Sequence, residues 1–253
     1  MHIASGDKER NILHGMDLLD RAAKEADLVA LPEMWTVGYD FHHLEEQATH
    51  PGDELMERLS ALARYNGVTL AAGSIPFAFP DGIYNTSFVF GPDGRVKAVY
   101  RKVHLFSGFV EARVMKAGTE YVCAHANGVD VGLSICYELR FPEMFRALAG
   151  EGATLILMAA SWPAERLSHW RILSEARAIE NEVFFAAVNG VGSYKGIRLG
   201  GHSLFIAPDG TVAAEGGDEE ALLFGEYDHD AVLRQRKALS VWNDIKENIP
   251  LRK

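Results

Sequence analysis

The order of predicted strands and helices constrains the fold most, because the same order occurs twice along the chain. In each half an apolar strand is followed by an amphipathic helix, a second strand and a hairpin. The expected ranges are 28–31, 53–65, 68–75 and 87–100 in the first half, and 155–160, 165–181, 183–188 and 203–214 in the second. The hairpin turns are nearly alike, Gly-Pro-Asp-Gly at 91–94 and Ala-Pro-Asp-Gly at 207–210. These repeats predict one structural unit used twice.

Two such units predict an α/β protein whose two sheets pack against each other beneath outer helices. This is a four-layer α-β-β-α sandwich with two pseudo-repeated halves. The alternative is a single doubly wound sheet, which also alternates strands and helices. The paired hairpins argue against it, since they add antiparallel edges that a purely parallel sheet lacks. A helix at 8–26 precedes the first unit, and a last strand is expected at 222–227.

The charge balance limits the partners that the protein can bind. The 253 residues include 35 acidic and 25 basic ones, which gives a net charge of −10. Nucleic acid and anionic membrane surfaces would be repelled, so neither is expected as a partner. A small anionic substrate stays compatible, because a few arginines can reverse the potential inside a pocket.

Cysteine usage and hydropathy predict a cytoplasmic protein. Cys123 and Cys136 form no CxxC pair, which fits a reducing compartment. The first residues show no basic region followed by a long apolar run, so no secretory signal is expected. The longest apolar stretch, 155–160, is far shorter than the roughly 20 residues of a membrane helix.

Three residues that can carry chemistry follow the ends of predicted strands. Cys136 follows an apolar strand and precedes Pro142, which suits the first turn of a helix. Backbone N–H groups at such a junction can stabilise a thiolate or an oxyanion. Glu33 follows the strand at 28–31, and Lys102 follows the first hairpin. Singly, a buried cysteine, a loop glutamate and a surface lysine would be ordinary; together they supply a nucleophile, a base and a cation.

The segments around these residues resemble the three signatures of the nitrilase, or carbon–nitrogen hydrolase, superfamily. They read Leu-Pro-Glu33, Tyr-Arg-Lys102-Val-His-Leu and Ile-Cys136-Tyr-Glu-Leu-Arg-Phe-Pro-Glu. The resemblance runs from about residue 7 to 227 and includes Ser-Trp-Pro at 161–163. It implies the α-β-β-α sandwich, a carbon–nitrogen hydrolase domain over 1–229 and a Glu-Lys-Cys triad. The family's second glutamate matches Glu111. Residues 230–253 are then expected to form an arm, packed on the same domain or on a partner subunit.

The implied roles agree with ordinary thiol chemistry. Lys102 would help Cys136 to ionise, and Glu33 would take the thiol proton, pass it to the leaving amine and later activate water. Lys102 and the backbone N–H of Tyr137 would stabilise the oxyanion, an interaction whose loss costs a factor of about 10² to 10³ in rate. Glu111 would orient Lys102 or assist proton transfer. The expected course is a covalent thioester, with ammonia released before the carboxylic acid; Cys123 is expected to serve packing.

The segments around Tyr137 and Trp162 look most like the ω-amidase branch, which deamidates 2-oxoglutaramate and 2-oxosuccinamate. Such a substrate carries a carboxylate, and Arg166 is the first candidate to bind it, before Lys195 and Arg198. Aliphatic amides and N-carbamoyl compounds are the alternative substrates within the superfamily.

Two features depart from the family pattern. Met1-His2-Ile3 is shorter than the usual first strand, so the edge of one sheet is either shortened or numbered late. Glu138 stands where several ω-amidases have Asp, a change expected to alter the depth of the pocket.

The sequence disfavours two other functional classes. A metal site is disfavoured by the absence of HxH, HExxH or CxxC spacing; its possible ligands would be His104, His169, His202, Glu33 and Cys136. A non-catalytic binding protein on the same fold is disfavoured by the complete Glu, Lys and Cys set. We therefore expect an amidase without metal or cofactor, acting on a small molecule and assembled as a homodimer or a higher homo-oligomer.

Overall fold

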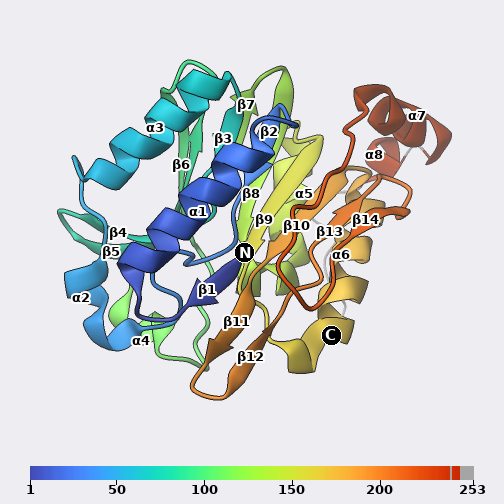
Figure 1. The fold of residues 1–253 in the computed structure, drawn as a ribbon. Helices are drawn as coiled ribbons and strands as arrows, with labels where there is room; N and C mark the ends of the chain where they lie inside the picture. The colour runs from blue at the N-terminus through green and yellow to red at the C-terminus, as the bar shows by residue number, and fades with distance from the viewer. Residues whose placement is uncertain (240, 246–253) are drawn as a thin grey trace.

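Two large sheets form the centre of the molecule, which is described over residues 1–239 and 241–245 in a computed structural model (Figure 1). The first sheet has the order β2-β3-β5-β4, with β6 paired to β5: β2 Leu28–Ala30, β3 Thr69–Ala71, β4 Ile75–Phe79, β5 Gly82–Phe90 and β6 Val96–Arg101. The second has the order β14-β13-β10-β9-β8-β7: β7 Cys123–Ala126, β8 Val129–Ile135, β9 Leu155–Ala160, β10 Phe184–Asn189, β13 Leu204–Ile206 and β14 Val212–Glu215.

Helices cover the outer faces of both sheets (Figure 1). The helices α1 (Lys8–Ala22) and α3 (Glu54–Asn66) contact each other and the first sheet. On the opposite side, α5 (Pro142–Gly150) and α6 (Leu167–Asn181) contact each other and the second sheet. Short helices connect other elements: α2 Leu44–Gln47, α4 Glu111–Val114 and the 3-10 helices η1 Phe41–His43, η2 Cys136–Arg140 and η3 Ala164–Arg166. The predicted α-β-β-α sandwich is confirmed.

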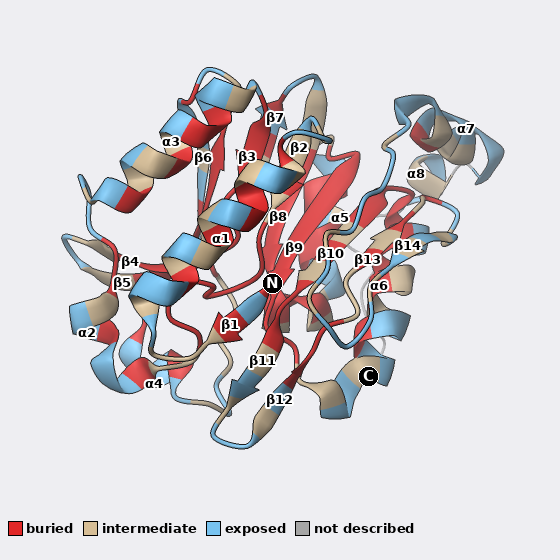
Figure 2. Cartoon of the chain, in the orientation of Figure 1, coloured by how far each residue is buried: buried red, intermediate tan, exposed pale blue. Residues whose placement is uncertain are grey.

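The alternation of side chains along each strand distributes the first sheet between two cores. Val29 and Leu70 pack with α1 and α3, whereas Ala30 and Ala71 face the second sheet. Both faces of these strands are therefore buried, as Figure 2 shows for the centre of the molecule. This explains why the strands read as continuous apolar runs rather than alternating ones.

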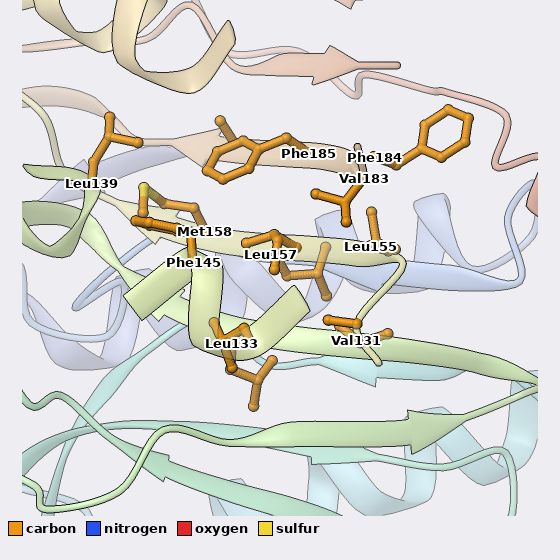
Figure 3. Close-up of a cluster of buried hydrophobic side chains, with 14 of the residues drawn as sticks. Val131, Leu133, Leu139, Phe145, Leu155, Leu157, Met158, Val183, Phe184 and Phe185 are labelled. Atoms are coloured by element: carbon orange, nitrogen blue, oxygen red, sulfur yellow. The ribbon is translucent and has the colours of Figure 1, made fainter. Parts of the chain in front are cut away.

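The second sheet carries the larger core. Figure 3 shows part of it, where Leu133 and Leu157 come from adjacent parallel strands and Phe145 comes from α5. Gly132 lets α5 approach closely, because a Cβ there would lie 2.6 Å from Ile156 and 3.2 Å from Leu148. The close packing keeps the end of β8 fixed, and Cys136 follows directly.

Three expectations about strands were incomplete or wrong. The strand expected at 68–75 is divided, and β4 forms a second hairpin with β5. The segment at 222–227 forms no strand; Leu223 and Phe224 are exposed there, so its apolar residues do not mark a buried ladder. A third, small sheet, unpredicted, joins β1 (His2–Ala4) to β11 (Val191–Tyr194) and β12 (Ile197–Gly200). The short first strand thus pairs with the second half instead of extending the first sheet.

The described part of the C-terminal arm packs on its own chain. Val232 of α7 (His229–Leu239) is fully buried in the core of the second sheet. Trp242 of α8 (Val241–Asp244) lies beneath two guanidinium groups, those of Arg146 and Arg236, at 5.0 and 5.4 Å. Residues 240 and 246–253 of the expected arm lie outside the described part. No helix among the described residues is long and apolar enough to cross a bilayer.

Candidate active site

Segments from both sheets meet at one edge of the sandwich. The backbone N–H of Glu33, just after β2, donates to the carbonyl of Ala160 at the end of β9 (3.4 Å). The hydroxyl of Ser161 donates in return to the carbonyl of Glu33 (2.9 Å). Lys102 follows β6 and Cys136 follows β8. The ends of four strands therefore bring the residues predicted from the sequence into one region.

A pocket of about 270 Å³ opens at this edge. Cys136, Lys102 and Glu111 line it together with Tyr39, Phe106 and Tyr137. These three aromatic rings leave room for only a small substrate beside the thiol. Glu33 is fully buried and reaches the pocket through its hydrogen-bond partners.

The backbone is strained beside both reactive residues. Cys136 has a φ of 48°, and Met34, which follows Glu33, has a φ of 50°. Side chains other than glycine rarely adopt this left-handed conformation, which is retained where the surroundings impose it and is frequent at active sites. Tyr137, the next residue, is the second residue of η2 and lies in its first turn, where backbone N–H groups lack helical partners.

Lys102 joins the two glutamates into one buried network. Its ammonium group donates to Oε1 of Glu33 (2.8 Å) and to both carboxylate oxygens of Glu111 (2.8 and 3.1 Å). Asn85 on β5 also bridges the two carboxylates, with 3.0 Å to each. The backbone N–H of Phe106 completes the set on Glu111 (2.8 Å). Glu111 thus contacts the ammonium group of Lys102 through both carboxylate oxygens, which is compatible with the orienting role expected from the sequence.

The charges of this network stabilise one another. Burial alone would lower the pKa of Lys102, but the carboxylates of Glu111 and Glu33 outweigh it and raise that pKa. Burial alone would raise the pKa of Glu111, whereas its contacts with Lys102 lower it. Lys102 is therefore a permanent cation in the folded protein.

Lys102 favours ionisation of the Cys136 thiol less than the sequence suggested. Burial and the neighbouring negative charge of Glu33 raise the pKa of its thiol, and Lys102 offsets only part of this effect. The ammonium group of Lys102 already shares its donors between two carboxylates, which explains its weak action on sulfur. The proton must therefore leave sulfur during the attack on the substrate.

Tyr39 and Ser161 complete the surroundings of Glu33. The hydroxyl of Tyr39 donates to Oε2 of Glu33 (2.9 Å) and lies 3.9 Å from the sulfur of Cys136. The backbone N–H of Ser161 donates to the same carboxylate oxygen (3.1 Å). Sequence reasoning missed Asn85, because its partners lie far away along the chain. It missed Tyr39 although Glu33 is close in sequence, because no regular element at 34–39 indicates that the hydroxyl turns back toward that carboxylate.

Contrary to the expectation from the sequence, Glu138 does not line the pocket. Its buried carboxylate accepts from the hydroxyl of Tyr100 (2.6 Å) and from the backbone N–H groups of Val103, His104 and Ile135 (2.9, 3.1 and 2.8 Å). These donors belong to the Lys102 segment and to the Cys136 segment. Glu138 therefore ties the two segments together beneath the pocket.

Glu138→Gln should destabilise the fold by about 3 kcal/mol, because one amide oxygen cannot serve four buried donors. Glu138→Asp keeps two acceptor oxygens and should lose less. Urea unfolding measures both, with the exposed Glu151→Gln as the control, expected within about 0.5 kcal/mol of wild type. Equal stability of Glu138→Gln and wild type would contradict this role.

The predicted substrate-binding residues all lie at the pocket, but they differ in how far they are buried there. Tyr137 and Trp162 line it, and Arg166 lies exposed at its rim. Arg140, which was not singled out, is half-buried and stacks over the ring of Trp162 at 4.8 Å. The signal for it was present, since it stands in the cysteine motif itself.

Other predicted candidates lie apart from the pocket. Lys195 contacts His42, and Arg198 pairs with Asp218 at 3.2 Å. Cys123 is half-buried on β7, where burial raises the pKa of its thiol to about 11.

The histidines weighed as metal ligands are dispersed. His104 stacks on Phe141, His169 contacts Arg140, and His202 pairs with Glu215. Within residues 1–239 and 241–245, no three His, Cys, Asp or Glu side chains gather as a metal site would require.

Comparison with known proteins identifies the family of this chain. A family model described as Carbon-nitrogen hydrolase matches residues 1–237. A 2-oxoglutaramate amidase of Bacillus subtilis is 37% identical over 98% of this chain and 95% of its own. An omega-amidase of Homo sapiens is 30% identical over 96% of this chain and 91% of its own.

Solved structures show the same fold. A CN-hydrolase superfamily protein of Xanthomonas campestris, with an arsenic adduct in its active site, has a TM-score of 0.91 at 28% identity, covering 98% of this chain and 96% of that one. A mutant amidase of Nesterenkonia, in which acrylamide has added to the active-site cysteine, has a TM-score of 0.79 at 30% identity, with 97% of each chain covered.

The α-β-β-α sandwich, with a thiol, a lysine and two glutamates at one small pocket, is the arrangement of a thiol-dependent hydrolase for small substrates. The nearly full-length matches then specify the bond that is cleaved. The chain belongs to the carbon–nitrogen hydrolase family and is an enzyme that hydrolyses amides. The resemblance drawn from the three sequence motifs is confirmed.

Proposed function

We propose that the enzyme is an ω-amidase, which hydrolyses the terminal amide of 2-oxoglutaramate or 2-oxosuccinamate through a thioester on Cys136. The observation that carries the mechanism is the buried network of Glu33, Lys102 and Glu111 beside the thiol. The relatives named as 2-oxoglutaramate amidase and omega-amidase support the substrate class.

The first half of the reaction forms the thioester. The thiol proton of Cys136 moves to the carboxylate of Glu33 while sulfur attacks the amide carbon. The carbonyl electron pair moves to oxygen, where Lys102 and the backbone N–H of Tyr137 stabilise the negative charge. The C–N bond then breaks, and the leaving nitrogen takes the proton from Glu33 and departs as ammonia.

The second half regenerates the thiol. Glu33, again a carboxylate, takes a proton from water as the water oxygen attacks the thioester carbon. The C–S bond breaks, sulfur recovers a proton from Glu33, and the carboxylic acid leaves. Glu111 keeps the ammonium group of Lys102 aimed at the site through both halves.

The carboxylate of the substrate needs a cation in the pocket. Arg140 is better placed for it than Arg166, because it is half-buried and held against Trp162, whereas Arg166 is exposed. Partial burial strengthens an ion pair with a substrate, since water screens it less.

Arg140→Leu should lower kcat/KM for 2-oxosuccinamate about 10- to 100-fold, the value of a charge-assisted hydrogen bond, and leave butyramide nearly unchanged. Arg166→Leu should have a smaller effect, and Arg198→Leu, outside the pocket, should have none. Ammonia release measures all three. Equal losses on the charged and the neutral amide would remove the case for an anion site at Arg140.

A substrate panel tests the function itself. Purified enzyme should release ammonia from 2-oxoglutaramate and 2-oxosuccinamate with kcat/KM at least about tenfold above that for butyramide, a difference that one charged contact can supply. A preference for N-carbamoyl compounds or for simple aliphatic amides would replace the ω-amidase assignment.

Assembly, domain division and location are proposed in the same way. Residues 1–229 would form the hydrolase domain and residues 230–253 its arm. Exposed Ile172 and Ile179 on α6 support a homodimer or a higher homo-oligomer, which light scattering would test. Unpaired Cys123 and Cys136 support a cytoplasmic location.

A further inference from the structure

The carboxylate of Glu33 is fully occupied by hydrogen-bond donors. A carboxylate offers about four lone-pair positions. Oε1 accepts from Lys102 (2.8 Å) and Asn85 (3.0 Å), and Oε2 accepts from Tyr39 (2.9 Å) and the backbone N–H of Ser161 (3.1 Å). A proton from the thiol therefore finds no free position on the base unless one donor withdraws.

Only the hydroxyl of Tyr39 has a single proton within reach of two acceptors. The Ser161 N–H belongs to the backbone, and Lys102 and Asn85 are both held by Glu111 as well. The hydroxyl of Tyr39, however, lies 3.1 Å from the carbonyl oxygen of Ser161 in addition to its contact with Glu33. A hydroxyl has one proton and rotates freely about its C–O bond, so it can donate to either oxygen in turn.

We propose that Tyr39 is a further catalytic residue, whose hydroxyl turns from Oε2 of Glu33 to the carbonyl of Ser161 as the thiol proton arrives. The inference rests on the proposed function, in which Glu33 is the base for Cys136. Tyr39 keeps its own proton throughout, and its vacated position on Oε2 receives the proton from sulfur. The protonated carboxyl can then donate to the phenolic oxygen, so that neither protonation state of Glu33 leaves a polar group unpaired.

The position of the ring supports this role. Tyr39 lines the pocket, its oxygen lies 3.9 Å from the sulfur, and its ring is held at 5.7 Å from those of Phe41 and Phe109. Rotation of the O–H bond needs no movement of the ring. The charged and titratable groups around it are Glu33, Cys136 and Lys102 on the neighbouring segments, Glu111 on α4, and Arg140 at the pocket wall.

Tyr39→Phe removes a hydrogen-bond donor that stabilises the carboxylate form of Glu33. The acid limb of the kcat/KM profile should move to higher pH by about one to two units, the equivalent of one hydrogen bond to a charged group. The plateau rate should fall about tenfold, because the protonated carboxyl loses its acceptor. Site-specific 3-fluorotyrosine at position 39, a stronger donor, should move the acid limb to lower pH.

The control is Tyr84→Phe, which loses a hydroxyl–carboxylate bond of 2.6 Å to Asp81 away from the pocket. Its acid limb should match that of wild type. Thermal unfolding verifies that each variant is folded. An acid limb that stays in place in both Tyr39 variants would overturn the inference, even where KM or stability changes. Failure of the proposed function is distinguishable, since wild type would then prefer N-carbamoyl compounds or simple aliphatic amides to 2-oxoglutaramate and 2-oxosuccinamate, whatever the position of the acid limb.

Discussion

Replacing Cys136 by alanine should abolish amide hydrolysis, with a loss in kcat of about 10⁴- to 10⁶-fold, and should leave the fold intact. The sulfur is the nucleophile that attacks the amide in the proposed mechanism, and neither Lys102 nor Glu33 is free to replace it, because both are bound in the buried network. Alanine retains the Cβ of cysteine, so the backbone at φ 48° is strained no more than before.

Ammonia release under single-turnover and steady-state conditions measures the loss, and thermal unfolding verifies the fold. Cys123→Ala is the matched control, since it removes the other thiol outside the pocket; its activity should stay within about twofold of wild type. A folded Cys136→Ala protein that retains wild-type turnover would exclude the thioester. A thioester trapped on wild type and identified at Cys136 by mass spectrometry would support it directly.

Lys102→Met should have the largest effect on stability. The ammonium group balances two buried carboxylates, and removing one partner of a buried ion pair costs about 3–5 kcal/mol. Lys116→Met is the control, because its pair with Asp81 is 3.8 Å long and more than half exposed; such pairs are worth about 1 kcal/mol or less. Urea unfolding compares the two, and equal losses would contradict a buried network.

The same variant should reverse the pH dependence of stability in the acid range. In wild type, Lys102 lowers the pKa of Glu111, so the native state resists protonation and stability is lost as the pH falls through 4.5 and below. Without Lys102, Glu33 and Glu111 face each other uncompensated in a buried site, and at least one carboxyl pKa rises above its unfolded value. The folded state then binds more protons than the unfolded one, so Lys102→Met should gain stability as the pH falls from 7 toward 5. A decline over this interval would contradict the assignment.

Much of the fold was predictable because its signals are local. The strands at 28–31 and 155–160 are recognisable as apolar runs. The two Pro-Asp-Gly turns indicate the hairpins at 87–100 and 203–214. The small third sheet was not predictable, since β1 and β11 pair across nearly the whole chain and neither has a pattern that specifies its partner. The strand at 222–227 was wrongly predicted for the same reason, because the sequence of an apolar segment does not show whether another strand pairs with it or covers it.

In the candidate site, too, the local features were predictable and the features set by tertiary contacts were not. Glu33, Lys102, Cys136 and Glu111 were identified because each stands in a motif that can be read along the chain. The direction of the pKa shift on Cys136 could not be read along the chain, because burial and the distances to Glu33 and Lys102 set it.

By itself the sequence determined which side chains are the candidates for the chemistry and at which strand ends they stand. Only the tertiary structure decided what surrounds them: Asn85 between two carboxylates, Glu138 beneath the pocket, and Tyr39 between Glu33 and Ser161. The reason is physical. A motif is a property of neighbouring residues, whereas a hydrogen bond across two sheets depends on how the whole chain packs.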